Sequence, residues 1–194
     1  CMYLFTGMAD WEAQSGSTEY ILALDRLWDN VVGANMYITG GIGSSRHNEG
    51  FTTDFDLPNE DAYCETCASV GMLKGEGRYV DILERAMYNG ALAGISLSSD
   101  RFFYVNPLAS AGNHHRKPWY GTACCPSQIS RFLPSVGGYI YAVSPNDIWI
   151  NLYIGSNTAV KVGGTQVAVK TETEYPWDGN VNISINPRWP KRFG

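Results

Sequence analysis

The sequence predicts an α+β chain, with helices in its first half and strands in its second half. From residue 2 to about residue 94, apolar residues recur at intervals of three and four, the period of an amphipathic helix. From residue 139 onward, short runs of β-branched and aromatic residues alternate with turn residues, as in a series of strands. The chain has 194 residues, of which 44% are hydrophobic, so it can bury a proper core.

Two segments of the first half carry the clearest helical period. Apolar side chains over residues 20–32 and 79–92 fall on one helix face, so each segment is expected to form an amphipathic helix. The sequence also enters a helical pattern directly at Met2, with no capping residue before it. We therefore expect a succession of helices, the first of which is already under way where the printed sequence starts.

A long irregular segment, residues 33–61, separates these helices. Three glycines and a proline interrupt any period there: Gly40, Gly41, Gly43 and Pro58. Loops of this length inside a compact domain are usually functional or disordered. The segment also carries five charged or polar candidates near the first cysteines, namely Arg46, His47, Glu49, Asp54 and Asp56. It is therefore expected to contribute to a functional site.

The second half divides into about five short strands. Residues 139–143 and 148–154 flank a turn, and residues 158–162 and 165–172 flank a Gly-Gly pair, which is a strong hairpin signal. So few strands do not close a β-sandwich comfortably. Together with the uncapped first helix, this predicts a chain that is cut at both ends.

Composition excludes several classes of function. A net charge of −5 with only 14 basic residues argues against a nucleic-acid-binding surface. No apolar run approaches the length of about 18 residues that a membrane span needs, and the first segment does not resemble a signal peptide. The five cysteines are odd in number and clustered, unlike a secreted disulfide scaffold, so a cytoplasmic location is expected. The 6 Trp and 12 Tyr supply flat surfaces on which sugars can stack.

Four of the five cysteines fall in two tight clusters. Cys64 and Cys67 lie in the sequence YCETC, and Cys124 and Cys125 lie in WYGTACCP. Adjacent cysteines seldom form a disulfide with each other, because the bond needs Cβ atoms about 3.5–4.5 Å apart at a dihedral near 90°. Thiol pairs that converge from two places usually bind a metal, and residues three apart can reach one ion from one helix face. The clusters therefore predict a metal site, whereas Cys1 is expected to be structural or incidental.

Spacing alone leaves two ligand sets open. One set consists of four sulfurs. In the other, Glu65 replaces Cys64, because a carboxylate oxygen is also an acceptable zinc ligand. On an ideal helix Glu65 and Cys67 point about 200° apart. Their joint binding therefore requires that the helix begin nearby or that the backbone depart from helical geometry.

Two further patterns suggest other chemistry. His114 and His115 precede Cys124 by ten and nine residues, which would allow a thiol nucleophile paired with a histidine base, as in cysteine hydrolases. The presence of a second thiol cluster favours the metal over this pairing. Asp54 and Asp56 could form a carboxylate pair, but alternate positions in a loop favour solvated side chains.

Six motifs in a fixed order resemble one enzyme family. They are ITGGIGS at residues 38–44, HNEGF at 47–51, LPN at 57–59, AYCETCA at 62–68, FYVNPL at 103–108 and CCP at 124–126. Together they resemble the β-L-arabinofuranosidases of glycoside hydrolase family 127 and their relatives, over nearly the whole sequence. The resemblance implies the C-terminal part of an (α/α)6 catalytic barrel at residues 1–137, followed by an incomplete β-sandwich at residues 138–194.

The resemblance also implies a mechanism and a metal. Family members that resemble this sequence retain the anomeric configuration and use a zinc-bound cysteine thiolate as the nucleophile. Matched by motif, Cys124 is the nucleophile and a Zn²⁺ ligand, and the other ligands are Glu65, Cys67 and Cys125. Cys64 falls where the motif requires no thiol, so the family pattern removes it from the ligand set.

Glu49 matches the general acid/base of the family, and Tyr104 resembles a substrate-contacting tyrosine. A retaining glycosidase needs a group that protonates the departing oxygen and then activates water. The implied substrate is a β-L-arabinofuranoside or a related sugar of pectic or plant glycans. The alternative is a non-catalytic zinc- or carbohydrate-binding fragment, followed by a Cys/His hydrolase. Because family members carry further barrel helices, association with the missing part of the barrel, or a homo-oligomer, is expected.

Overall fold

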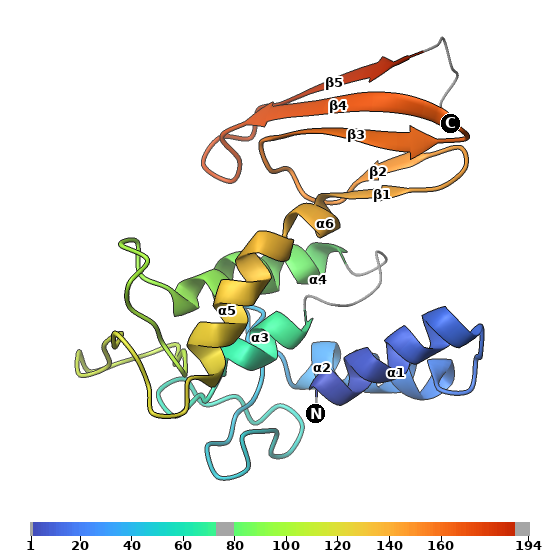
Figure 1. The fold of residues 1–194 in the computed structure, drawn as a ribbon. Coiled ribbons are helices and arrows are strands. Elements are labelled where there is room, and N and C mark those ends of the chain that lie inside the picture. The colour runs from blue at the N-terminus through green and yellow to red at the C-terminus, as the bar shows by residue number, and fades with distance from the viewer. Residues whose placement is uncertain (1, 73–79, 189–194) are drawn as a thin grey trace. The chain divides into compact units, whose positions relative to one another are not determined.

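The computed structural model describes residues 2–72 and 80–188 (Figure 1); Cys1 lies outside this part of the chain. The chain divides into two compact units, Cys1–Leu133 and Pro134–Gly194. Helices are the main regular structure of the first unit and strands that of the second, so the predicted α+β class is confirmed. No helix in the described ranges is both long enough and apolar enough to cross a membrane.

The first helix of the first unit packs against two others. The three helices are α1 (Met2–Ser15), α2 (Ile21–Ala34) and α3 (Thr66–Met72). α2 confirms the first predicted amphipathic helix, and α1 contacts both α2 and α3. The contact with α3 is close, because a Cβ added at Gly71 would lie 2.8 Å from the Met2 Cβ. The absent side chain at Gly71 therefore lets the start of α1 pack directly on α3.

The second predicted amphipathic helix, residues 79–92, is helical from Val80 onward but changes its winding, and residue 79 lies outside the described residues. α4 covers Val80–Arg85, a π-helix follows over Ala86–Ala91, and a 3-10 turn ends the segment at Leu92–Gly94. The π-helix packs against α3 so closely that a Cβ at Gly90 would lie 2.8 Å from the Ser69 Oγ. π segments are rare and often accompany functional sites. Here the wide turn lies against the helix that carries part of the first cysteine cluster.

The segment between α2 and α3 is irregular, as predicted, apart from isolated β-bridges. It folds around a small core of buried side chains and their neighbours, which are Tyr37, Ala62, Cys64, Leu57 and Leu108. The Tyr37 hydroxyl donates to the Pro58 carbonyl at 3.1 Å. Burial raises the pKa of Tyr37 to about 12, so the hydroxyl remains a donor at neutral pH. The long loop is thus an ordered part of the unit.

Asp54 and Asp56 hold this loop in place. The Asp54 carboxylate accepts hydrogen bonds from the Asn35 Nδ2 at 2.9 Å and from the Asn30 Nδ2 at 3.1 Å, which ties the loop to the end of α2. These bonds lower the pKa of Asp54. Asp56 accepts a hydrogen bond from the Thr52 hydroxyl. The two carboxylates are exposed, as expected, and in addition they stabilise the loop through these hydrogen bonds.

A short helix and a two-stranded sheet open the second unit. α5 (Cys124–Ser135) runs across the division between the units, and α6 (Gly137–Ile140) follows it. β1 (Tyr141–Val143) and β2 (Ile148–Ile150) then pair antiparallel. Residues 139 and 140, predicted as strand, belong to α6, because the Tyr139 N–H donates to the Val136 carbonyl and closes a helical turn.

The larger sheet has the strand order β3-β4-β5. Its antiparallel strands are β3 (Ser156–Val162), β4 (Thr165–Thr173) and β5 (Val181–Pro187). The predicted hairpin is confirmed: Val162 pairs with Thr165 across Gly163 and Gly164, whose φ angles are 51° and 81°. Two successive residues with positive φ suit the tight turn that matches strand twist. Val162, Val167 and Val169, each 0% exposed, form the core of this unit.

Candidate active site

Three cysteine thiols and one glutamate carboxylate of the first unit lie close together, although they come from two segments that are distant in the sequence. The Cys67 Sγ lies 2.7 Å from the Cys124 Sγ and 3.3 Å from the Cys125 Sγ. The Glu65 Oε1 lies 3.6 Å from the Cys125 Sγ and 3.9 Å from the Cys124 Sγ. Taking one donor atom from each residue, all four lie within 4.8 Å of one another. We call these four residues the thiol cluster.

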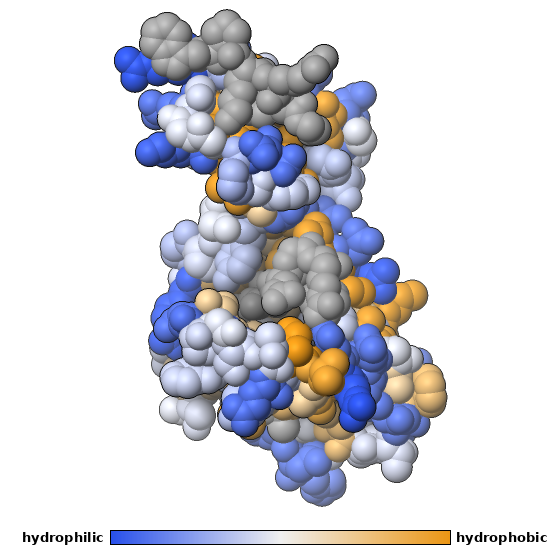
Figure 2. All heavy atoms as spheres, turned by 90° about the vertical axis from the view of Figure 1, so that its right-hand side faces the viewer, coloured by the Kyte–Doolittle hydropathy of each residue, from blue (hydrophilic) through white to orange (hydrophobic). Residues whose placement is uncertain are grey.

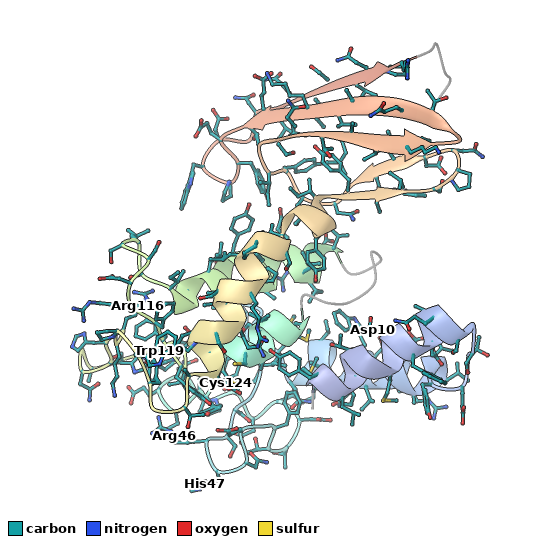
Figure 3. All side chains as sticks on the ribbon, viewed as in Figure 1. Asp10, Arg46, His47, Arg116, Trp119 and Cys124 are labelled. Atoms are coloured by element: carbon teal, nitrogen blue, oxygen red, sulfur yellow. The ribbon has the colours of Figure 1, made fainter. Side chains whose placement is uncertain are left out.

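Both halves of the thiol cluster lie where a helix begins. The Ser69 N–H donates to the Glu65 carbonyl at 3.1 Å, so Glu65 immediately precedes α3 and Cys67 lies in its first turn. Glu65 itself pairs in an antiparallel β-bridge and is not helical. This change of backbone geometry removes the separation of about 200° that an ideal helix would impose. Cys124 and Cys125 are the first two residues of α5 (Figure 3).

Cys64 takes no part in the cluster. Its side chain is 1% exposed and belongs to the apolar core with Tyr37 and Ala62. Burial raises the pKa of its thiol to about 12, so it behaves as a small neutral apolar group at physiological pH. Among the described residues, the group that could hold a metal contains Glu65 in its place. The geometry therefore favours the ligand set with Glu65 over the set of four sulfurs.

Replacing Cys64 with alanine is expected to leave metal binding intact. The lost sulfur leaves a small cavity, so the free energy of unfolding should fall by about 1 kcal/mol. The matched change Cys67→Ala removes a converging thiol and should release the metal. Elemental analysis and urea unfolding of both variants check this. A Cys64→Ala protein that is folded but has lost its metal would restore the four-sulfur set.

Cys124 differs from the other cysteines of the cluster in its access to solvent. Cys67 and Cys125 are 3% and 0% exposed, whereas Cys124 is partly exposed. Within the cluster Cys124 is thus the cysteine whose residue is least enclosed by protein.

The surroundings of the cluster disfavour negative charge. Burial raises the pKa of Cys124, and the hydrogen bond that Cys67 donates to Cys125, together with burial, raises the pKa of Cys67. Burial, followed by the charge of Glu49, raises the pKa of Glu65. A cation bound among such groups would favour their charged forms and so offset these effects of burial and like charge.

The donor set fits a zinc ion. Three thiols and one carboxylate are ligands that zinc accepts in a four-coordinate tetrahedral site. Tetrahedral zinc–sulfur bonds of about 2.3 Å would require the Cys67 and Cys124 sulfurs, 2.7 Å apart in this structure, to separate by about 1 Å.

Glu49 lies on a tight turn of the long loop. Ser45 and Gly50 close the turn by mutual backbone hydrogen bonds of 3.0 and 3.2 Å. The φ angle of Glu49 is 49°, which is uncommon for a residue other than glycine and recurs at functional sites. The Tyr63 hydroxyl donates to the Glu49 Oε1 at 2.9 Å. Burial and this hydrogen bond raise the pKa of Tyr63, so the hydroxyl stays a donor that orients the exposed carboxylate.

A pocket lies between Glu49 and two members of the thiol cluster, Glu65 and Cys67, whereas Cys124 and Cys125 are not among its described lining residues. Its lining includes Glu49, Tyr63, Glu65, Cys67 and Tyr3. The Tyr3 hydroxyl donates to the Cys67 carbonyl at 3.0 Å, so the start of α1 supplies one wall. The predicted acid/base and two predicted ligands thus line the same pocket.

Tyr104 lies between the two segments that supply the cluster. Its carbonyl accepts the Thr66 N–H at 3.0 Å and lies 3.6 Å from the Cys125 Sγ. Its ring packs against those of Tyr63 and Tyr120, with centroids 6.5 and 5.6 Å away. Burial raises the pKa of its hydroxyl. The structure therefore places this predicted substrate contact beside the cluster, with a protonated hydroxyl.

His114 supports the neighbouring backbone. Its ring stacks on Phe103 with centroids 4.5 Å apart, and its Nε2 lies 3.0 Å from the Val105 carbonyl. The Cys124 sulfur instead contacts the Cys67 sulfur and a carboxylate oxygen. This arrangement favours a metal site over a thiol–histidine pair.

Tyr63 is a functional neighbour that sequence reasoning missed. A buried tyrosine hydroxyl usually has a hydrogen-bond partner, and the position of Tyr63 directly before the first cysteine cluster was the available signal.

Three candidates that the sequence suggested have exposed side chains, namely Arg46, His47 and His115. Figure 3 labels the first two on the loop that carries Glu49.

Comparison with known proteins gives the class and then the family. The family profile described as "Beta-L-arabinofuranosidase, GH127 catalytic domain" matches residues 3–138, and "Beta-L-arabinofuranosidase, GH127 middle domain" matches residues 147–194. These matches place the chain among the glycoside hydrolases. Within that class it belongs to glycoside hydrolase family 127, which confirms the resemblance carried by the six motifs.

Individual relatives agree with this assignment. The non-reducing end β-L-arabinofuranosidase of Bifidobacterium longum subsp. longum is 37% identical over 206 residues, covering 95% of this chain and 31% of the relative. A solved GH127 β-arabinofuranosidase matches with a TM-score of 0.92 and 45% identity, covering 95% of this chain and 30% of that one. The GH127 β-L-arabinofuranosidase of Geobacillus stearothermophilus T6 matches with a TM-score of 0.90 and 40% identity, covering 96% and 33%. The chain thus spans about a third of the length of these relatives.

Proposed function

We propose that this chain carries the catalytic residues of a retaining glycoside hydrolase that acts on β-L-arabinofuranosides. One observation carries the proposal: three thiols and a carboxylate converge, and Cys124 is the partly exposed cysteine among them. Family membership supplies the substrate class. On this proposal residues 1–137 are part of an (α/α)6 barrel and residues 138–194 are the first portion of a β-sandwich.

A Zn²⁺ ion is the proposed cofactor. Its ligands are Glu65, Cys67, Cys124 and Cys125, whose donor atoms lie within 4.8 Å of one another. When bound, zinc supplies the positive charge that keeps thiols deprotonated in a buried setting. Cys64, enclosed in the apolar core, remains a neutral thiol.

Cys124 and Glu49 divide the reaction between them. The Cys124 sulfur attacks the anomeric carbon while Glu49 gives its proton to the departing oxygen, so the carbon–oxygen bond breaks and a carbon–sulfur bond forms. Glu49, now a carboxylate, takes a proton from water, and the resulting hydroxyl displaces the sulfur. Two displacements at one carbon retain its configuration.

Tyr63 and Tyr104 position the reacting groups. Tyr63 holds one carboxylate oxygen of Glu49 by its hydrogen bond of 2.9 Å. Tyr104, packed against Tyr63 and anchored through its carbonyl near Cys125, is the proposed contact for the sugar. Its protonated hydroxyl can donate a hydrogen bond to a sugar oxygen.

The test is hydrolysis of an aryl β-L-arabinofuranoside by the reduced, zinc-loaded protein. We expect release of the chromophore, its loss to background after chelation, and its return when zinc is added back. The matched aryl α-L-arabinofuranoside should not be cleaved, because the nucleophile reaches one face of the sugar. Full activity in zinc-free protein, verified by elemental analysis, would refute the proposed cofactor.

A second candidate is a zinc- or carbohydrate-binding fragment without activity of its own. It is favoured by the short span of this chain relative to the family members. An apolar groove between α1 and α2 supports association with further parts of the fold or with a second copy; it is lined in part by Phe5, Leu24 and Trp28. Leu4 and Leu22 on these helices are exposed. Figure 2 shows hydrophobic groups at the surface of the face that it presents. If an N-terminally extended protein is active and the 194-residue chain binds zinc without turnover, this candidate holds.

A further inference from the structure

Asn106 makes hydrogen bonds on both sides of Glu65. Its side-chain Nδ2 donates to the Cys64 carbonyl at 2.9 Å and to the Thr66 hydroxyl at 3.0 Å. Its backbone N–H is 3.2 Å from the Cys64 carbonyl and 3.4 Å from the Tyr63 carbonyl. One asparagine thus contacts the residue before Glu65 and the residue after it.

The orientation of the Asn106 amide follows from these partners. A carbonyl oxygen only accepts hydrogen bonds, so the Nδ2 must face Cys64. The Thr66 hydroxyl gives its own proton to the Phe103 carbonyl at 3.0 Å and is therefore available to accept from Asn106. The buried Asn106 Oδ1 has no hydrogen-bond partner among the described residues. An unpaired buried oxygen is unfavourable, so the amide is oriented by its two donated hydrogen bonds at the expense of its oxygen.

The backbone that Asn106 holds is unusual. Cys64 has a φ angle of 35°, a left-handed conformation that β-carbon-bearing residues seldom adopt. Two residues later Thr66, which is 0% exposed, begins α3. The backbone therefore changes from the left-handed conformation at Cys64 to the α-helix that begins at Thr66, with only Glu65 between them. From this path of the backbone the Glu65 carboxylate lies 3.6 Å from the Cys125 sulfur.

We infer that Asn106 is a positioning residue for the metal ligands, because it fixes the turn from which Glu65 and Cys67 reach the thiol cluster. The inference rests on the zinc site of the proposed function. Asn106 touches neither the metal donors nor the proposed nucleophile; it acts on their backbone through Cys64 and Thr66. Partners of this kind behind metal ligands typically change metal affinity by about 10- to 100-fold when they are removed.

The experiment measures zinc affinity in the full chain by competition with a chromophoric chelator. Asn106→Asp keeps the shape, removes both N–H donors and places a carboxylate against the Cys64 carbonyl. We expect affinity to fall by about 10- to 100-fold, and the thiolate-to-cobalt charge-transfer absorption of the Co²⁺ form to weaken. Asn89→Asp is the matched control, since Asn89 also donates to a backbone carbonyl, that of Arg85 at 3.2 Å. It should bind zinc as the unchanged protein does.

Thr66 supplies a second pair of variants in case Asn106→Asp does not fold. Thr66→Val fills the same space but removes both the acceptor of the Asn106 hydrogen bond and the donor to the Phe103 carbonyl; it leaves the Asn106 bond to Cys64 in place and should weaken zinc binding by less than Asn106→Asp. Thr66→Ser keeps the hydroxyl and should retain the original affinity. Unchanged affinity in folded Asn106→Asp, or in Thr66→Val where the former is unfolded, overturns the inference. An unchanged protein that binds zinc but cleaves no arabinofuranoside contradicts the proposed function alone, and one that binds no zinc contradicts both.

Discussion

Replacing Cys124 with serine is expected to lower kcat/KM for an aryl β-L-arabinofuranoside by about 1,000-fold or more, equivalent to about 4 kcal/mol of transition-state stabilisation. Cys124 is the partly exposed sulfur of the thiol cluster. A serine oxygen can still occupy the position, but it is a weaker zinc ligand and a far less nucleophilic group near neutral pH. Steady-state kinetics measure the loss, and zinc content is determined on the same sample.

The matched control is Cys125→Ser, which changes an enclosed thiol of the same helix turn. It should weaken zinc binding yet leave the activity of fully zinc-loaded protein within about tenfold. Activity of Cys124→Ser equal to that of the unchanged protein would rule out the cysteine nucleophile. Similar losses in both variants at full zinc occupancy would assign Cys124 a ligand role only.

Replacing Glu49 with glutamine is expected to lower kcat/KM by about 100- to 10,000-fold for substrates with poor leaving groups. The amide cannot protonate the departing oxygen or take a proton from water. Aryl substrates with acidic leaving groups need less help in the first step, so for them the second step becomes limiting. A covalent sugar adduct on Cys124 should then accumulate, and mass spectrometry of the intact protein followed by peptide mapping would detect it.

Two variants of neighbouring residues serve as controls for Glu49. Tyr63→Phe removes only the hydroxyl that donates to Glu49, so it should cost a smaller part of the activity and leave its dependence on the leaving group largely unchanged. Asp54→Asn changes a carboxylate of the same loop that bonds to Asn30 and Asn35, and should keep the mechanism intact. If Glu49→Gln loses activity equally for good and poor leaving groups and forms no adduct, Glu49 is not the acid/base.

The regular elements were largely predictable because each depends on a local pattern. The apolar period gave α2, and the Gly163-Gly164 turn gave the β3–β4 hairpin. The π-helix over Ala86–Ala91 was not predictable, since its wide turn depends on packing against α3 and not on a period of its own. The strand expected from residue 139 starts at Tyr141 for a related reason: a backbone bond extends the preceding helical turn.

The candidate site was predictable only as a set of alternatives. Spacing presented Cys64 and Glu65 as equal choices, because both are close in sequence to Cys67. Cys64 is excluded because it is buried in an apolar core, whereas Glu65 reaches the cluster because the backbone changes its geometry there. Both features depend on contacts with residues that are distant in the sequence. Tyr63 and Asn106 were missed for the same reason, since their hydrogen-bond partners are set by the fold.

The two halves of the thiol cluster are separated by 57 residues between Cys67 and Cys124 and by 60 between Glu65 and Cys125. An ion held by both halves closes a loop of that length, as a disulfide would, but through bonds that exchange with solution. For a covalent link, a loop of about this length restricts the unfolded chain by about 4 kcal/mol. If the proposed zinc site is occupied in this way, metal supply and protein stability are coupled: a cell short of zinc would lose folded protein as well as the proposed activity, and restoring the ion would recover both.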